Sequence, residues 1–568
     1  MAYASPVNDM RFLLDHVLSF DKVAATDTFA EATPDTVEAI LTEAARMCDE
    51  VIAPLNRAGD LHPAHLENGI VRTSPGFDEG YKAIAEGGWL GVTADPEYGG
   101  MGLPTVLNTA INDMMSGACI SLQLNPTLTL GQIEALEAHG SDELKALYLP
   151  KLISGAWSGA MTLTGPQAGR DVGALRSKAE PQGDGTYKIS GQKIYISWAD
   201  ADFMDNICHL VLARLPGGAP GTKGISLFLV PKFIPDAEGN PGARNDLRVV
   251  SLEHKMGLHG SPTAVMEYDG ATGWLVGEEH AGMAAMFTMM NNARLVVGAQ
   301  GIGVAEAAFQ HALSYAVDRK QGAAPRSGAI VEHADVRRML TQMKADIFAA
   351  RAIALDCAIS LDMGKATDHD DWHARAALLT PIAKAFGTDV GIQVADTGIQ
   401  VHGGMGFVEE TGAAQFARDV RVTAIYEGTN GIQAMDLVAR KMMDGGDAAY
   451  RLLDEVEAEA EDARGARPEL AEAVWGAAES LREATEWIIA HDMTDLFSGA
   501  SPYLRAFARV LGAHYHLKAA ISESTAGPRT ALAQFYITRL LPEHAALLAQ
   551  VRVGADGLFD LSPDDLAA

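Results

Sequence analysis

Hydrophobic residues follow two different spacings along the chain, and the order of these spacings predicts the architecture. Apolar positions recur every three or four residues over residues 35–157 and again over residues 281–445, as in amphipathic helices. Between them, residues 158–280 contain short runs rich in β-branched and aromatic residues, separated by turn residues. We therefore expect an N-terminal α-helical domain, a small antiparallel middle β-barrel or sandwich, and a C-terminal four-helix bundle.

Both ends of the chain lie outside this three-part pattern. Residues 1–34 form an N-terminal extension, and residues 446–568 are rich in alanine and glutamate before becoming apolar again. The second segment predicts an additional helical domain. With 568 residues the chain is long enough for several domains, so the expected class is a multidomain α+β protein.

Composition and charge narrow the classes of partner. The formal net charge of −30 disfavours nucleic acid, because phosphate binding needs a basic surface. The four cysteines lie far apart with no Cys-x-x-Cys pair, which signals neither a disulfide framework nor a metal site. The first residues lack a basic segment followed by an apolar one, and no apolar run is long enough to span a bilayer. We expect a cytoplasmic protein that does not insert into membranes.

Common cofactor and nucleophile motifs are missing from the sequence. There is no Gly-x-Gly-x-x-Gly after a strand, no Walker A loop, no Gly-x-Ser-x-Gly and no His-Glu-x-x-His. Gly298, Gly301 and Gly303 lie inside a helical pattern, where glycine typically allows close helix packing. Any cofactor is therefore expected in a cleft between domains.

Two β-rich segments have groups that suit a flavin ring, another ring system or a phosphate. Residues 161–172 run from a strand into a Gly/Pro turn and expose main-chain amides and threonine hydroxyls, although an ordinary strand exit has the same composition. Residues 195–198 alternate aromatic and hydroxyl side chains. Tyr195 suits packing against a ring system, or it is simply a core residue.

Two helical segments end in unusual polar or glycine-rich stretches. In residues 400–407 a helix ends in two glycines, which serve as a C-cap or let the main chain approach a pyrophosphate. In residues 426–430 a glutamate stands in a glycine-containing break between helices. Such a glutamate is usually solvated, but beside an apolar cavity desolvation raises its pKa towards that of a general base.

Two arginines complete the candidates. Arg319 lies at a helix end, where a positive charge favours the helix dipole without any ligand. Arg294 lies in an otherwise apolar helix and requires a partner if it is buried.

Taken together, the order and spacing of these segments over residues 35–442 resemble the acyl-CoA dehydrogenase family. The resemblance implies FAD as cofactor and Glu427 as the base that removes the α-proton of an acyl-CoA thioester while flavin N5 accepts the β-hydride. The FAD contacts that it implies are Met161, Leu163, Thr164, Gly169, Tyr195, Ser197, Arg319, Gln400, Gly403, Gly404, Thr429 and Asn430. The substrate contacts that it implies are Arg170, Arg294, Tyr426 and Gly428.

The same resemblance implies partners. In the family, the segments similar to Arg319 and the Gln400 turn serve the FAD of a neighbouring subunit, so a homo-oligomer, dimer or tetramer, is expected. An electron-transfer flavoprotein is the expected electron acceptor.

The subgroup and substrate are expected from the long tail and two further segments. Residues 256–262 and 271–277 resemble a long bacterial subgroup with an added C-terminal domain, which includes 3-(methylthio)propionyl-CoA dehydrogenases of the DMSP demethylation pathway. We expect 3-(methylthio)propionyl-CoA as substrate. The alternatives are a medium- or long-chain fatty acyl-CoA dehydrogenase, an acyl-CoA oxidase, and a non-catalytic acyl-CoA-binding protein. Two residues depart from the family pattern: Gly165 stands where the family usually has Glu, and Arg170 stands where it has a small hydroxyl residue.

Overall fold

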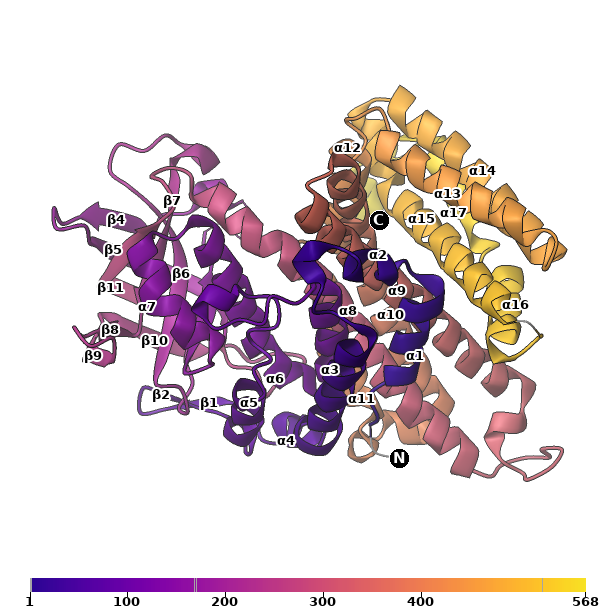
Figure 1. The fold of residues 1–568 in the computed structure, drawn as a ribbon, viewed down its shortest axis with the longest axis horizontal. Coiled ribbons are helices and arrows are strands. Elements are labelled where there is room, and N and C mark those ends of the chain that lie inside the picture. Colours follow the sequence, from indigo (N-terminus) through magenta and orange to yellow (C-terminus); the bar gives the residue numbers. More distant parts are fainter. Residues whose placement is uncertain (1–2, 168, 170, 524) are drawn as a thin grey trace. The chain divides into compact units, whose positions relative to one another are not determined.

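The computed structural model describes residues 3–167, 169, 171–523 and 525–568. The chain forms two compact units (Figure 1). Unit 1 consists of Met1–Thr42, Pro104–Gly117 and Arg294–Ala568, and unit 2 consists of Glu43–Leu103 and Ala118–Ala293. The five-domain division predicted from the sequence is a different partition and stays a prediction. The helices that contribute to both units are α3 (Pro34–Met47), α6 (Thr105–His139) and α8 (Gly282–Asp318).

Unit 2 contains the β-structure, and its main sheet closes into a barrel. The strands of this sheet are β3 (Trp157–Thr162), β4 (Lys178–Pro181), β5 (Tyr187–Ser197), β6 (Asn206–Arg214), β7 (Ile225–Pro231), β10 (Leu247–Leu252) and β11 (Thr263–Val276). Neighbours pair in the order β5–β4–β6–β7–β11, and β11 returns to β5, so the pairing forms a closed ring. The predicted middle β-barrel is therefore confirmed.

The prediction that this barrel is antiparallel is wrong in one place. β3 pairs with β6 in parallel over six residue pairs, and β4 continues along the same edge of β6, also in parallel. Parallel neighbours need a long crossover connection. Here the chain between β3 and β6 supplies it, because it contains β4 and β5. Short-range alternation in the sequence does not reveal which distant strands become neighbours.

Smaller elements surround the barrel of unit 2. Two hairpins lie outside the main sheet, β1 (His65–Glu67) with β2 (Ile70–Arg72) and β8 (Phe233–Pro235) with β9 (Pro241–Arg244). The helices that belong wholly to unit 2 are α4 (Leu55–Leu61), α5 (Phe77–Glu86) and α7 (Asp142–Ile153). The β1–β2 hairpin lies in a region for which the sequence predicts a helical domain without strands.

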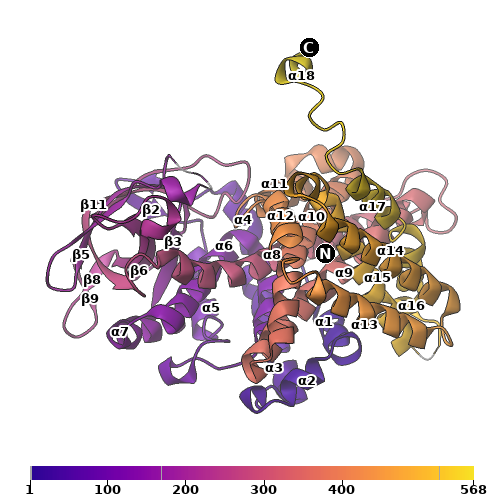
Figure 2. The ribbon, with the colours of Figure 1, turned by 90° about the horizontal axis from the view of Figure 1, so that it is seen from above.

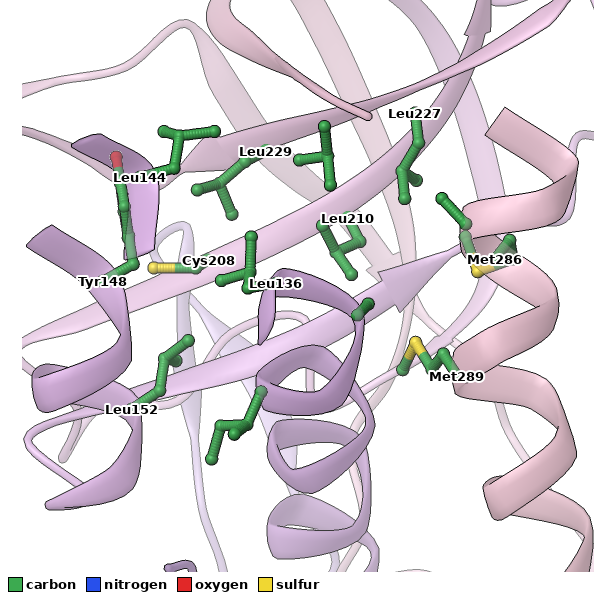
Figure 3. Packing of buried hydrophobic residues seen from close by; sticks show 14 of the residues in the cluster. Leu136, Leu144, Tyr148, Leu152, Cys208, Leu210, Leu227, Leu229, Met286 and Met289 are labelled. Carbon is green, nitrogen blue, oxygen red and sulfur yellow. The ribbon is translucent and has the colours of Figure 1, made fainter. Parts of the chain in front are cut away.

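The core of unit 2 lies where helices pack on the barrel (Figure 3). Leu136 of α6 and Tyr148 of α7 meet Leu210 of β6 and Leu229 of β7, and Met286 from the start of α8 joins the same cluster. All five side chains are buried. Burying apolar surface in this way stabilises the fold by roughly 25 cal/mol per Å² removed from water.

Unit 1 is helical. Its helices besides α3, α6 and α8 are α1 (Val7–Phe12), α2 (Phe20–Ala24), α9 (Ala334–Thr367), α10 (Asp370–His402), α11 (Ala413–Val420), α12 (Asn430–Ala439), α13 (Asp447–Ala463), α14 (Pro468–Ala490), α15 (Met493–Ser522), α16 (Pro528–Arg539), α17 (Glu543–Val553) and α18 (Pro563–Ala567). The expected C-terminal bundle and additional helical domain are both helical, and α13–α17 pack together while the segment with α18 stands away from them (Figure 2). In the described ranges, no helix is both long enough and apolar enough to cross a membrane.

Glycines bring α8 and α10 into main-chain contact within unit 1. A Cβ at Gly298 would lie 2.8 Å from the carbonyl oxygen of Ala383, and one at Gly301 would lie 2.5 Å from that of Gly387. Any larger residue would force the helices apart. The interpretation of these glycines as helix-packing residues is confirmed.

Core packing in unit 2 gives a direct stability prediction. Replacing the fully buried Leu210 with alanine should lower the free energy of unfolding by about 2–5 kcal/mol, because the cavity cannot fully collapse. Urea unfolding followed by tryptophan fluorescence measures this, since Trp157 and Trp198 are buried in the same unit. The control is Leu566→Ala at a side chain that is 72 % exposed, with an expected change within about 0.5 kcal/mol. Equal effects of the two substitutions would contradict this account of the core.

Candidate active site

Glu427 lies in a short irregular segment between a 3-10 turn, Arg421–Ala424, and helix α12. Its φ is 55° and that of the following Gly428 is 84°, so two consecutive residues are left-handed. Glycine adopts this conformation freely, but for glutamate it is uncommon and costs free energy of about 1–3 kcal/mol. A strained residue of this kind persists only when the surrounding structure holds it.

Hydrogen bonds on both sides hold the segment. Gln433 of α12 donates from Nε2 to the carbonyl oxygens of Glu427 and Gly428, at 3.2 Å each. The hydroxyl of Tyr426 donates to Oε1 of Gln300, a buried residue of α8. Burial raises the pKa of Tyr426, which therefore remains a neutral donor. Both neighbours of the Glu427 backbone are thus anchored to helices.

The glutamate carboxyl group has a perturbed pKa. Burial raises the pKa of Glu427, and the positive charges of Arg294 and Lys384 partly offset this by favouring the carboxylate. A glutamate with a raised pKa next to two cations suits a general base, because it can hold a proton and still be ionised when the reaction begins. The raised pKa is in the direction that the sequence predicts beside an apolar cavity, and the role of Glu427 as the base stays a prediction.

Arg294 is buried, and the structure supplies the partner that its burial requires. The side chain is 7 % exposed, and Nη1 lies 3.3 Å from Oδ2 of Asp436 on α12. Nε is buried and meets no acceptor among the described residues. The Asp436 carboxylate therefore compensates the buried guanidinium charge, while the Nε–H stays without an acceptor among the described residues.

Lys384 of α10 also lies at the candidate site, although no sequence motif pointed to it. It is fully buried, and Nζ donates to the carbonyl oxygen of Gly428 and to Oδ1 of Asn430, at 2.9 Å each. Burial lowers the pKa of Lys384 to about 8. A lysine in the apolar run around Ile382 and Phe386 was the available signal, since a buried cation needs specific acceptors.

The side chain of Asn430 is occupied by protein partners. Besides accepting from Lys384, it donates from Nδ2 to Oδ1 of Asp389 at 2.7 Å and to the carbonyl oxygen of Ala385 at 3.2 Å. Thr429 is the N-cap of α12, and its hydroxyl accepts from the amide of Ile432. The FAD contact predicted for Asn430 would have to use its main chain, because its amide group holds α12 to α10.

The first predicted flavin segment lies in unit 2 at the end of β3. The strand ends at Thr162, so Leu163 and Thr164 lie just beyond it. The Thr164 carbonyl oxygen accepts from the amide of Ile194, while the carbonyl of Leu163 accepts from Nζ of the buried Lys193. Met161, Leu163 and Thr164 are all half-buried. Gly169 has a φ of 44°, and Arg170 lies outside the described residues.

The second flavin segment contains a β-bulge. Between Lys193 and Ile196 of β5 the register shifts against β11, and the extra residue Tyr195 has a φ of 59°. The Tyr195 ring is 63 % exposed, so the interpretation of this tyrosine as a core residue is wrong. The bulge breaks the simple alternation of faces and turns the ring outward, while Ser197 remains paired with Thr263 at the strand end.

The glycine turn at the end of α10 is a helix C-cap, and its approach to a pyrophosphate stays a prediction. Gly403 is the C-cap of α10 with a φ of 61°. A Cβ on Gly403 or Gly404 would meet nothing within 4 Å, so the main chain there is open to a ligand. Gln400 is exposed next to this turn, and Arg319 is exposed after the end of α8. His402 is buried and stacks on Tyr315, which is a structural role.

The predicted cofactor residues fit FAD by their chemistry. Threonine and serine hydroxyls, an exposed aromatic ring, an amide side chain and open glycine main chain are groups that bind a flavin ring and a pyrophosphate. Glu427, Tyr426, Gly428, Thr429, Asn430 and Arg294 gather within unit 1, together with the unpredicted Lys384 and Asp436. Met161, Thr164, Tyr195 and Ser197 belong to neighbouring parts of the unit 2 barrel.

Family models match almost the whole chain. Models of the acyl-CoA dehydrogenase N-terminal, middle and C-terminal domains match residues 34–156, 160–271 and 280–443. A fourth model, described as acetyl-CoA dehydrogenase C-terminal like, matches residues 452–562.

Individual relatives agree with these models. The 3-methylmercaptopropionyl-CoA dehydrogenase of Ruegeria pomeroyi is 47 % identical over 470 residues, which cover 81 % of this chain and 79 % of the relative. Caenorhabditis elegans ACDH-11, solved in complex with C11-CoA, has a TM-score of 0.80 at 20 % identity and covers 98 % of this chain and 96 % of its own. The Bacillus anthracis acyl-CoA dehydrogenase complexed with FAD has a TM-score of 0.73 at 20 % identity, with 97 % and 92 % covered. The two solved structures share the fold, and with the family models and the sequence relative they show that the chain belongs to the acyl-CoA dehydrogenase family and is an FAD-dependent oxidoreductase.

Proposed function

We propose that Glu427 is the catalytic base, which removes the α-proton of an acyl-CoA thioester so that a trans-2-enoyl-CoA forms. Bound FAD supplies the acceptor for the hydride that leaves the β-carbon. The observation that supports the role of Glu427 is its environment: a carboxyl group with a pKa raised by burial, two cations beside it, and a left-handed backbone held on both sides. The α-proton ends on the Glu427 carboxylate. The electron pair of the broken α-C–H bond becomes the second bond between the α- and β-carbons, and the pair of the β-C–H bond leaves with the hydride.

The neighbours of Glu427 support the substrate side of the proposal. As negative charge grows on the thioester oxygen, a main-chain N–H at Glu427 is the donor that the family resemblance implies. Gly428 has no side chain that would fill the space next to the thioester, and a Cβ there would lie 2.9 Å from Nε2 of Gln433. Arg294 has one buried N–H without a partner among the described residues, which suits a polar atom of the substrate. Tyr426 contributes by fixing the segment to α8.

The proposal predicts the behaviour of Glu427→Gln. The variant should bind FAD as before, but anaerobic reduction of the flavin by acyl-CoA, followed as loss of flavin absorbance, should slow by at least about 100-fold, because the general base is gone. In the wild type the rate should rise with pH as Glu427 ionises. Since burial raises the pKa of Glu427, the midpoint should lie above the ordinary glutamate value of about 4.3.

A matched control is Glu472→Gln, at a glutamate whose side chain is 65 % exposed and pairs with Arg464. This variant should reduce its flavin at the wild-type rate. If acyl-CoA reduced the flavin of the Glu427→Gln variant at the wild-type rate, Glu427 would be ruled out as the base.

For the substrate, we propose 3-(methylthio)propionyl-CoA. The support is the 47 % identity over 81 % of the chain to a relative named for 3-methylmercaptopropionyl-CoA. Pentanoyl-CoA is the matched control ligand, because it replaces the thioether sulfur with a methylene of similar size. We expect kcat/KM to be about tenfold higher for the thioether substrate, which is the usual discrimination for one group in an apolar pocket. Equal values for the two ligands, or a maximum at longer chains, would remove this substrate assignment.

We also propose a homo-oligomer with an electron-transfer flavoprotein as acceptor, as the family resemblance implies. Exposed apolar side chains support a subunit contact at the glycine turn. Phe407 is 90 % exposed, and Met405 and Val408 beside it are also exposed. The cytoplasmic location stays a prediction.

The subunit contact has its own test. Replacing Phe407 with glutamate should place a charge in the contact and shift the molecular mass measured by light scattering towards that of the monomer. Phe559→Glu, at another strongly exposed phenylalanine in the C-terminal segment, is the control and should leave the mass unchanged. An unchanged mass for Phe407→Glu would contradict a contact at this turn.

A further inference from the structure

We propose that Lys384 is a positioning residue that fixes the main chain around Glu427 and thereby aims its carboxylate at the substrate. This inference rests on the proposed role of Glu427 as the base. It adds a residue on α10, more than forty positions earlier in the chain, to the parts on which proton removal depends.

The acceptors of Lys384 flank the catalytic residue. Nζ donates to the carbonyl oxygen of Gly428, the residue directly after Glu427, and to Oδ1 of Asn430 at the start of α12. Gln433 reaches the carbonyl oxygens of Glu427 and Gly428 from α12. The Gly428 carbonyl therefore accepts from both sides. Rotation of the Gly428–Thr429 peptide group, next to Glu427, requires both hydrogen bonds to break.

The main chain at Lys384 is held rigidly. Lys384 follows Ala383, whose carbonyl oxygen is in the close contact with Gly298 of α8, so its Cα cannot shift without disturbing two packed helices. Its side chain is fully buried and has little freedom to choose other acceptors. The position of Nζ is thus set by the helix pair.

The same part of α10 also holds the far end of the catalytic segment. Asn430 donates to the carbonyl oxygen of Ala385 and to Oδ1 of Asp389, and it shares hydrogen bonds with the hydroxyl of Thr388. Together with Lys384, these residues span little more than one turn of α10. A left-handed glutamate needs such support, because an unsupported segment would relax to an ordinary backbone conformation.

Charges around Lys384 link position to reactivity. Three charged groups act on the Lys384 ammonium: Asp389 on the same helix, Glu427 in the catalytic segment and Arg294 on α8. Arg294 in turn pairs with Asp436 of α12. The Lys384 ammonium favours the ionised form of Glu427. The negative charges of Glu427 and Asp389 in turn favour the protonated form of Lys384. Removing the lysine charge should therefore raise the pKa of Glu427, and the pH at which the base becomes active should move upwards.

The test uses the FAD-loaded enzyme and three variants. Lys384→Met removes both the hydrogen bonds and the charge, and Lys384→Gln keeps a donor without the charge. Lys344→Met is the control, because Lys344 is a partly buried lysine of unit 1 that pairs with Asp9, away from the catalytic segment. Anaerobic stopped-flow flavin reduction by acyl-CoA gives the rate constant at saturation, the apparent substrate affinity and the pH profile.

We expect Lys384→Met to lower the saturating rate constant by about tenfold or more, as small misplacements of a catalytic group do. The apparent substrate affinity should change by less than about threefold, because the lysine side chain is fully buried and donates to protein acceptors. The midpoint of the pH profile should rise by about one unit. Lys384→Gln should recover part of the rate but keep the shifted midpoint, and Lys344→Met should match the wild type.

The outcomes separate this inference from the proposed function. A wild-type rate constant and pH profile in Lys384→Met, with Glu427→Gln inactive, would overturn the positioning role and leave the base assignment intact. Normal flavin reduction by Glu427→Gln would overturn the base assignment itself. If both Lys384 variants fail to fold or to retain FAD while Lys344→Met is normal, the lysine serves the fold alone and the positioning role is likewise overturned.

Discussion

The close contact between α8 and α10 is the constraint on which the candidate site depends. Glycines on α8 meet main-chain carbonyls of α10, so the distance between the two helices is set by backbone atoms. Arg294 and Gln300 extend from α8 and Lys384 from α10, and all three act on the short segment with Glu427. A left-handed glutamate between these helices can be held only if the anchors themselves do not move.

Electrostatics and packing act together in this arrangement. Burial opposes ionisation of Glu427, and the two nearby cations restore part of it, so neither effect alone sets its pKa. The cations in turn are tolerated in a buried place because Asp436 and Asp389 compensate them. The base thus belongs to a charge network on three helices, and its acidity is a property of that network.

Much of this could be read from the sequence, and the failures have physical causes. Helical and strand periodicity, the packing glycines and the need of Arg294 for a partner all come from local patterns, and the structure agrees with them. The parallel pairing of β3 with β6 and the bulge at Tyr195 depend on how distant strands meet, which alternation within one strand does not encode. Lys384 was missed for the same reason, because its acceptors lie more than forty residues away in the chain.

The glycine contact between α8 and α10 also bears on how a family with this fold can diversify. A contact made by main-chain atoms offers no side chain to vary, and a larger residue at either glycine would force the helices apart. Among proteins with this fold, Gly298 and Gly301 of α8 should therefore be replaced rarely, and residues on the opposite face of the same helix should be replaced more often. New acyl specificities can then arise elsewhere while the geometry around the base is inherited unchanged.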